Sequence, residues 1–219
     1  MNMVSIPCRR ENFGGLRASK VKYLVIHYTA GHNDTAENNG KYFAREQVGA
    51  SAHYFVDETT VVQSVPDEYV AWHCGGNYYH HDKCRNSNAI GIEICTKYQG
   101  GEYSFAPEAV AHAQELTRQL MEKYEIPADR VLRHWDVTHK ICPAPFVGTG
   151  QTAWEEFKGG LIVYQKFEHV PDWARPTVEK LMEKGWLAGD GSGNLNLTND
   201  MVRMLVILDR AGNFGAKGA

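Results

Sequence analysis

Residues 21–28 read VKYLVIHY, a run rich in Val, Ile and Tyr with a histidine, His27, near its end. β-Branched and aromatic runs of this kind are typical of strands buried in a sheet. A second apolar run, NAIGIEICT at 88–96, has the same character and carries one charge, Glu93, in its middle. The sequence therefore predicts two core strands, each with one side chain capable of chemistry.

The segments around these strands predict helices and a hairpin. A turn with the sequence TAGHNDT precedes a predicted helix over 35–47, capped by Asp34 or Thr35. ASAHYFVDETTVVQSV at 50–65 predicts a hairpin around its polar DETT, and Pro107 opens a helix that Pro127 stops. Strands and helices mixed in this order predict an α/β (α+β) fold, with a mixed central β-sheet flanked by helices.

Composition excludes some classes of partner. The chain has 219 residues, is 43% hydrophobic, and has a formal net charge of -3 with a pI near 6.4. This balance gives no basis for binding nucleic acid, and no apolar run reaches the roughly 20 residues of a membrane span. Residues 1–10, MNMVSIPCRR, lack an apolar core, so we expect no signal peptide and synthesis in the cytoplasm.

Composition shifts after Phe157, which predicts a first domain over 1–160 and a linker with a small helical unit over 161–219. The second of two helices in this unit has Thr198 as its expected cap. Helical spacing predicts one apolar face for it, formed by Met201, Met204, Leu205 and Leu208. About forty residues make a weak core alone, so we expect this unit to dock on the first domain or to form a homodimer.

Five cysteines leave at least one unpaired. Cys74 and Cys84 flank a loop rich in Gly, Tyr and His, and a disulfide between them is one interpretation. In a reducing compartment free thiols are the default. Cys95 follows an apolar run, and packing is the better explanation for it.

The stretch RHWDVTHKICPAP at 133–145 holds His134, Lys140 and Cys142. With His27, the His and Cys of this stretch would form a His2Cys site of the kind that leaves zinc an open position. Spacing alone favours the simpler interpretation, a hydrogen-bonded histidine and a packed cysteine. On an extended segment Lys140 would share a side with Cys142 and stabilise an oxyanion, although a surface lysine is the commoner case.

Alternation along IGIEIC places Glu93 on one strand face with Gly91 and Cys95, opposite three isoleucines. A carboxylate partly desolvated near a metal can serve as a general base with a pKa near neutrality. A solvent-facing glutamate on an edge strand fits the pattern equally well.

Five blocks occur in order along the chain: VIHYTAG, SAHYFVD, AWHCGG, NAIGIEIC and RHWDVTHKICPAP. In this order they resemble the zinc-dependent N-acetylmuramoyl-L-alanine amidases of the type 2 amidase family, to which the peptidoglycan recognition proteins are related. The resemblance covers roughly residues 12–158. It implies a peptidoglycan hydrolase that cleaves the amide between N-acetylmuramic acid and L-alanine of the stem peptide.

The resemblance also implies residue roles. His27, His134 and Cys142 match the family's zinc ligands, Glu93 matches its base, and Lys140 matches the lysine that assists the polarised carbonyl. The recycling branch has Asp at the third ligand position. Cys142 therefore places the chain nearer the phage and prophage endolysin branch, whose members act on the wall after holin-type release or lysis.

One departure from the family pattern concerns Ala52, where phage lysozyme-type members place a catalytic tyrosine. This favours Glu93 as the proton handler and leaves His53 and Tyr54 structural or lining the cleft. The loop over 72–88 is an expected cleft wall or, equally, a variable surface loop in which His73, His80 and His81 form an adventitious metal patch. The expected substrate-contacting residues are Thr29, His53, Trp72, His73 and Asn88.

Two alternatives to an endolysin stay open. One is a non-catalytic peptidoglycan-binding module, which Cys142 and Glu93 disfavour. The other is an intracellular amidase for soluble muropeptides, which Cys142 also disfavours. The segment after residue 172 resembles a single degenerate S-layer-homology repeat, which implies wall binding or dimerisation, with bacterial peptidoglycan as the partner.

Overall fold

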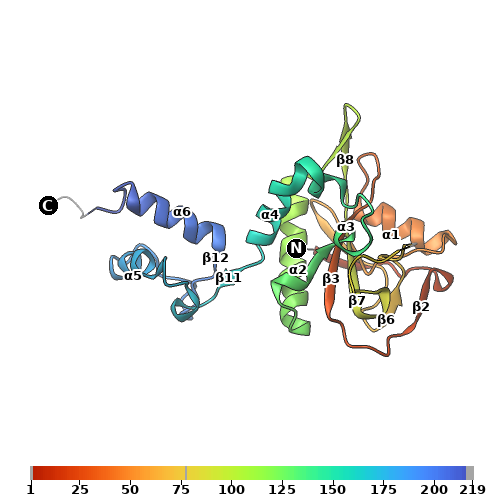
Figure 1. Cartoon of the computed structure of the whole chain (residues 1–219), viewed down its shortest axis with the longest axis horizontal. Helices are drawn as coiled ribbons and strands as arrows, with labels where there is room; N and C mark the ends of the chain where they lie inside the picture. Colours follow the sequence, from red (N-terminus) through yellow and green to blue (C-terminus); the bar gives the residue numbers. More distant parts are fainter. Residues whose placement is uncertain (1, 77, 216–219) are drawn as a thin grey trace. The chain divides into compact units, whose positions relative to one another are not determined.

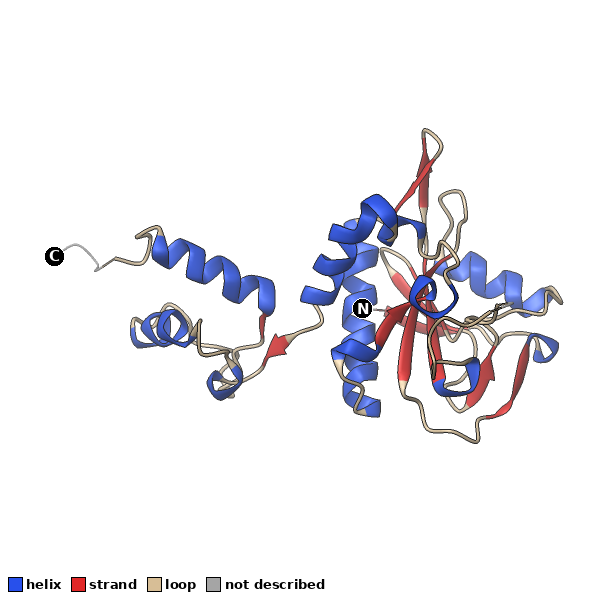
Figure 2. Cartoon of the chain, viewed as in Figure 1, coloured by secondary structure: helices blue, strands red, loops and turns tan. Residues whose placement is uncertain are grey.

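The computed structural model describes residues 2–76 and 78–215, arranged in two compact units (Figures 1 and 2). The first unit covers residues 1–155 and the second begins at residue 156, within helix α4 (Gln151–Gly159). Among the described residues, no helix has both the length and the apolar character needed to cross a bilayer.

A six-stranded sheet forms the centre of the first unit, in the order β1-β5-β4-β7-β3-β10. The β4–β5 pair is antiparallel and the other four pairs are parallel, so the sheet is mixed, as predicted. The strands are β1 (Asn2–Ser5), β3 (Tyr23–Tyr28), β4 (Tyr54–Val56), β5 (Thr60–Gln63), β7 (Ala89–Ile94) and β10 (Val131–Arg133).

The two predicted core strands lie side by side inside this sheet, where β7 is fourth and β3 fifth in the strand order. Strands β3 and β7 are parallel neighbours, and five of the six residues in each are buried. Strands covered on both faces are expected to read as nearly continuous apolar runs, which is what both sequences show. Glu93 is the one residue of β7 that is not fully buried.

Helices cover both faces of the sheet (Figure 1). Helix α2 (Pro107–Tyr124) contacts β3, β4 and β7, whereas α1 (Ala36–Arg45) contacts β4 and β5. Phe55 of β4 packs in one buried cluster with Ala36 of α1 and with Cys95 beyond β7, so α1 lies on the Glu93 side of the sheet. Helix α2 buries Leu116 and Leu120, and each buried leucine contributes about 1.5–3 kcal/mol.

Local signals set the ends of these helices. The Thr35 hydroxyl accepts a hydrogen bond from the Asn38 backbone N–H at 3.2 Å, which confirms one of the two predicted caps of α1. Helix α2 begins at Pro107 as predicted. It ends at Tyr124, before Pro127, because Glu125 adopts a left-handed conformation with φ 54°.

Two small antiparallel ribbons complete the first unit. Strand β2 (Phe13–Leu16) pairs with β6 (Tyr69–Ala71), and β8 (Lys97–Gln99) pairs with β9 (Glu102–Ser104). Gly100 and Gly101 form the β8–β9 turn with φ of 63° and 91°, a region that favours glycine. This hairpin was not predicted from the sequence.

The second unit has its own small core. It comprises β11 (Val163–Tyr164), α5 (Arg175–Glu183), β12 (Leu197–Thr198) and α6 (Asn199–Arg210). Thr198 caps α6 by accepting from the Met201 N–H at 3.2 Å, as predicted. The buried cluster consists of Val170, Ala174, Val178, Leu195, Leu197, Val202 and Val206.

The predicted apolar face of α6 is right for Leu205, which packs against the core, and wrong for Met201 and Met204. Val202 and Val206 face the core, whereas Met201, Met204 and Ile207 are 54%, 56% and 60% exposed. The sequence MVRMLVIL is apolar nearly all round the helix, so helical spacing alone could not distinguish the packed side from the exposed one.

Candidate metal centre and active site

Three parallel strands bring three functional side chains to one edge of the sheet. His27 of β3 is the register partner of Glu93 of β7. On the other side of β3, Arg133 of β10 pairs with Ile26, so the next residue, His134, stands beside His27. Carboxyl ends of neighbouring parallel strands are where ligands bind in open α/β sheets.

The structure brings the three predicted metal ligands together. One donor atom from each of His27, His134 and Cys142 lies within 4.8 Å of the others, and all three residues are buried. The Cys142 Sγ is 3.5 Å from Nδ1 of His27, and the two histidine ring centroids are 4.8 Å apart.

A short helix and a turn position His134 and Cys142. The Asp136 carboxylate fixes the start of helix α3 (His134–Thr138). It accepts a hydrogen bond from the Arg133 backbone N–H at 2.7 Å and forms an ion pair with the Arg133 guanidinium at 2.7 Å. The chain then turns back at His139, whose φ is 60°, and the Cys142 carbonyl accepts from the Trp135 N–H at 2.8 Å. The two ligands are therefore held on one rigid turn.

Unpaired polar atoms concentrate at this cluster. Among the described residues, five enclosed side-chain polar atoms have no hydrogen-bond partner, and four of them belong to His134, His73 and Glu93. Native proteins pair nearly all buried polar groups, and an ion held by His27, His134 and Cys142 would pair a ring nitrogen of His134. Two imidazoles and a thiol make a donor set that suits Zn²⁺.

The electrostatics of the cluster favour neutral ligands. Burial lowers the pKa of His27 well below its usual value, and burial with the Lys140 charge lowers the pKa of His134 to about 4. Both imidazoles are therefore neutral at pH 7, which leaves lone pairs for a metal. Burial, followed by the Glu93 charge, raises the pKa of Cys142 to about 12, so the thiol needs a bound cation to ionise.

Glu93 has the surroundings of a general base. Its Oε2 is enclosed and unpaired, and burial raises its pKa to about 8 while the Lys140 charge lowers it. Lys140 itself is exposed, and its charge acts on Glu93 and on all three candidate ligands. Its segment is not extended as predicted, because the Cys142 N–H donates to the Lys140 carbonyl at 2.7 Å in a tight turn.

Two residues expected to contact substrate have structural positions instead. His53 is fully buried, with Nδ1 accepting from the Gly91 N–H at 3.0 Å and Nε2 3.2 Å from the Tyr69 carbonyl. The side-chain amide of Asn88 makes two hydrogen bonds within the loop. Its oxygen accepts from the Arg85 N–H, and its NH₂ group donates to the Lys83 carbonyl. These positions do not support the interpretation of either residue as a substrate contact.

Thr29 and Trp72 keep accessible surface. Thr29 is half-buried beside Thr96, and Trp72 is 38% exposed. His73 lies against the candidate ligands, since its Nδ1 is 3.0 Å from Nε2 of His27. It is therefore a neighbour of a candidate ligand and not part of an exposed wall.

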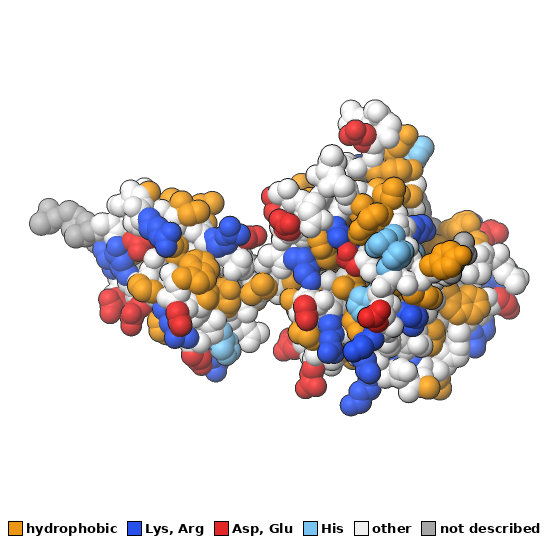
Figure 3. All heavy atoms as spheres, viewed as in Figure 1, with side chains coloured by type: hydrophobic (Ala, Val, Ile, Leu, Met, Phe, Trp, Pro, Cys, Tyr) orange, Lys and Arg blue, Asp and Glu red, His pale blue; other side chains and the backbone are white. Residues whose placement is uncertain are grey.

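Two cysteines anchor the 72–88 loop in the core, whereas Tyr78 is 80% exposed and Lys83 is exposed. Cys74 and Cys84 are fully buried free thiols in a cluster with Tyr23, Val25, Ala89 and Val137. Histidines gather on the surface over α3 (Figure 3), where the rings of His80 and His139 stack at 3.4 Å. The metal-ligand group found among the described residues includes none of His73, His80 and His81, which does not support the predicted three-histidine patch; Asn77 lies outside the described residues.

Sequence reasoning missed a group of aromatic side chains beside the cluster. Tyr28, next to His27, packs edge-on against Tyr103 of the β8–β9 hairpin at 5.4 Å, and His32 stacks on Tyr98 at 4.0 Å. The signal was the Gly-Gly turn between two short tyrosine-containing runs, which is a hairpin pattern.

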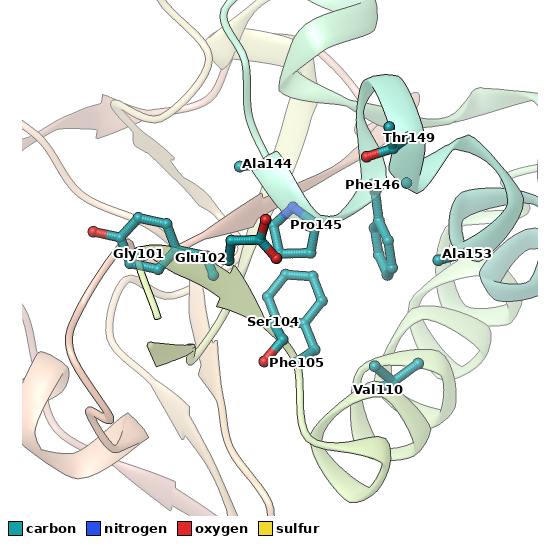
Figure 4. A pocket seen from close by; sticks show the side chains of 12 residues that line it. Gly101, Glu102, Ser104, Phe105, Val110, Ala144, Pro145, Phe146, Thr149 and Ala153 are labelled. Carbon is teal, nitrogen blue, oxygen red and sulfur yellow. The ribbon is translucent and has the colours of Figure 1, made fainter. Parts of the chain in front are cut away.

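A cavity of about 550 Å³ opens between β9, α2 and the turns after Cys142 (Figure 4). The side chains of Phe105, Pro145 and Phe146 face it, with Val110 of α2 below and Glu102 at its rim. None of its lining residues was predicted to belong to the site.

Comparison with known proteins agrees with this geometry. Residues 17–145 match the N-acetylmuramoyl-L-alanine amidase family, type 2, and the chain belongs to that family. The amidase BlyA of Bacillus subtilis (strain 168) is 36% identical in an alignment 159 positions long, which covers 67% of this chain and 42% of BlyA. The amidase CwlL of Bacillus licheniformis is 36% identical in an alignment 148 positions long, which covers 61% of this chain and 39% of CwlL.

Solved structures resemble the same part of the chain. The catalytic domain of XlyA is 27% identical with a TM-score of 0.60, and a mutant endolysin from Bacillus subtilis is 28% identical with a TM-score of 0.61. Each match covers 74% of this chain and 99% of the other. The chain thus spans a whole catalytic domain of this kind but less than half of the curated relatives BlyA and CwlL.

Proposed function

We propose that this protein is a zinc-dependent N-acetylmuramoyl-L-alanine amidase that acts on bacterial peptidoglycan. It hydrolyses the amide between N-acetylmuramic acid and L-alanine of the stem peptide. The observation that carries the proposal is the convergence of His27, His134 and Cys142 next to the unpaired Oε2 of Glu93. Membership of the amidase family supports the choice of bond.

The chain would hold the ion through His27, His134 and Cys142. When bound, zinc polarises the scissile carbonyl and lowers the pKa of the attacking water. Neutral imidazoles at pH 7 support this role, because protons do not compete for their lone pairs.

Glu93 transfers the proton in this reaction, and Lys140 stabilises the developing negative charge. The Glu93 carboxylate takes the proton of the attacking water at Oε2 and returns it to the nitrogen of the leaving L-alanine. A pKa near neutrality suits both halves of this transfer. The exposed Lys140 ammonium stabilises the negative charge that develops on the carbonyl oxygen. Thr29 and Trp72, which keep accessible surface, contact the substrate.

The proposal places the enzyme among endolysins that reach the wall after release from the cell in which they are made. For the second unit we favour wall binding or self-association. The exposed apolar side chains of Met201, Met204 and Ile207 support a role in contact with another surface. A dimer would appear as a concentration-dependent mass in analytical ultracentrifugation, and a wall-binding unit as sedimentation with purified sacculi.

Mass spectrometry of digested sacculi, with and without a zinc chelator, tests the proposed activity. We expect free lactyl groups on the glycan and new L-alanine amino ends, both lost with chelator and restored by Zn²⁺. Sedimentation with sacculi without new amino ends would instead identify a non-catalytic binding module. Activity on soluble muropeptides but not on intact sacculi would identify a recycling type of amidase.

A further inference from the structure

His73 contacts the ring edge of His27 at Nε2, the nitrogen that does not face Cys142. Its Nδ1 is 3.0 Å from Nε2 of His27, and the two rings are nearly perpendicular, at 88°. The other ring nitrogen of His27, Nδ1, faces the Cys142 sulfur. The two nitrogens of His27 therefore have separate partners, Cys142 at Nδ1 and His73 at Nε2.

This contact couples the tautomer of His27 to that of His73, because one of the two nitrogens must donate and the other accept. A neutral imidazole carries one N–H and one lone pair. If Nε2 of His27 carries the hydrogen, it donates to Nδ1 of His73, and Nδ1 of His27 is free for an ion. The opposite tautomer would place an N–H inside the cluster and leave no lone pair there.

A glycine makes room for this arrangement. A Cβ at position 91 would lie 2.5 Å from Cγ of His73, far inside van der Waals contact. Gly91 is in turn held by His53, whose Nδ1 accepts from the Gly91 N–H at 3.0 Å and whose backbone N–H donates to the Gly91 carbonyl at 3.1 Å. This accounts for a glycine in the middle of a buried strand, where glycine is otherwise unfavourable.

We propose that His73 is a positioning residue that fixes the tautomer of His27. The absence of a side chain at Gly91 leaves the room that the His73 ring requires. The inference rests on the metal site of the proposed function. It assigns His73, expected to contact substrate, to the support of a ligand. Partners of this kind orient metal-bound histidines, and their loss typically weakens metal binding about 10- to 100-fold.

Zinc affinity, measured by competition with a chromophoric chelator, tests the proposal on the full chain. His73→Leu removes the acceptor, and Gly91→Ala displaces the ring while keeping it. His73→Asn keeps an acceptor oxygen at the position of Nδ1. His80→Leu, in the same loop but stacked on His139, is the matched control.

We expect affinity to fall about 10- to 100-fold for His73→Leu and Gly91→Ala, and to stay close to that of the unchanged protein for His73→Asn and His80→Leu. In the zinc-loaded unchanged protein, ¹⁵N NMR should place the His27 proton on Nε2. Circular dichroism with chelator present checks that each variant folds. If His73→Leu does not fold, Gly91→Ala and His73→Asn decide the question.

Failure of the proposed function and failure of the proposed role of His73 give different results. An unchanged protein that binds no zinc contradicts the proposed function itself. An unchanged protein that binds zinc, with His73→Leu and Gly91→Ala as tight as His80→Leu, overturns only the role of His73. A proton on Nδ1 of His27 in the loaded protein would also overturn that role.

Discussion

His27 and Glu93 are register partners on adjacent parallel strands, β3 and β7. The candidate ligand and the candidate base are thus carried by two adjacent inner strands of the sheet and not by loops. Sites built on strands hold their geometry better than sites built on loops. This relationship makes the roles of ligand and base separable by mutation, because each side chain can be changed on the same rigid frame.

Removal of a ligand should abolish zinc binding and the stabilisation it gives. A ligand that binds only the folded state adds about 4 kcal/mol at 1,000 times its dissociation constant. We expect the melting temperature of the unchanged protein to fall on chelation, and that of Cys142→Ala to be insensitive to chelator and to zinc. Thermal melts with zinc, with chelator and with chelator followed by zinc measure this. A zinc-dependent melt of Cys142→Ala would show that the ion binds elsewhere.

Glu93→Gln should keep zinc and lose catalysis. The amide has nearly the shape of the carboxylate but cannot take a proton, and general-base catalysis contributes about 10²- to 10⁴-fold. We expect the rate of release of amino ends from sacculi to fall within that range. The zinc content of the purified variant should remain stoichiometric. Activity within a few-fold of the unchanged protein would assign the base to another residue.

The raised pKa of Glu93 predicts a pH dependence of stability in the metal-free protein. Its pKa is about 8 in the folded protein against 4.5 as the reference, so the folded state holds a proton that the unfolded state releases between these values. The stability contributed by Glu93 is therefore complete below about pH 4.5 and is lost as pH rises through about 8.

Glu93→Gln removes this titration and leaves the other groups in place. Relative to the variant, the unchanged protein should lose about 2 kcal/mol of unfolding free energy between pH 5 and pH 8, since one pKa unit corresponds to about 1.4 kcal/mol and Glu93 keeps some contact with solvent. Urea unfolding of both proteins in chelator measures the difference. A difference that stays constant with pH would contradict the burial of this carboxylate.

The packing of α6 predicts which of its apolar residues stabilise the second unit. Val202 is fully buried, whereas Met204 is 56% exposed. Val202→Ala should destabilise the unit by about 1–3 kcal/mol, and Met204→Ala by less than about 0.5 kcal/mol. Limited proteolysis of the full chain, followed at cleavage sites after residue 160, compares the two variants. Equal protection would mean that α6 packs through its other face.

Much of the central sheet was predictable because its strands are continuous apolar runs. VKYLVIHY and IGIEIC each carry one side chain capable of chemistry, and their parallel pairing places His27 beside Glu93. Cys142 and Lys140 were predictable from the ordered blocks and not from spacing. The turn that returns Cys142 to His134 depends on the left-handed His139, which no pattern in the sequence specified.

Other features could not be predicted from the sequence because they depend on contacts between distant segments. The position of the His73 ring requires a glycine, Gly91, which lies eighteen residues further along the chain on strand β7. His53 reads as a cleft residue in SAHYFVD, yet its ring is used to hold the backbone of Gly91. On α6, the choice between two apolar faces is made by the rest of the second unit, not by the helix itself.

Anomalous diffraction from a crystal of the zinc-loaded protein, measured above and below the zinc absorption edge, tests the central claim most directly. We predict one strong peak bound by Nδ1 of His27, a ring nitrogen of His134 and Sγ of Cys142, at about 2.0–2.1 Å from nitrogen and about 2.3 Å from sulfur. A peak that shares no atom with these three side chains, or no peak in protein that retains amidase activity, would contradict the account.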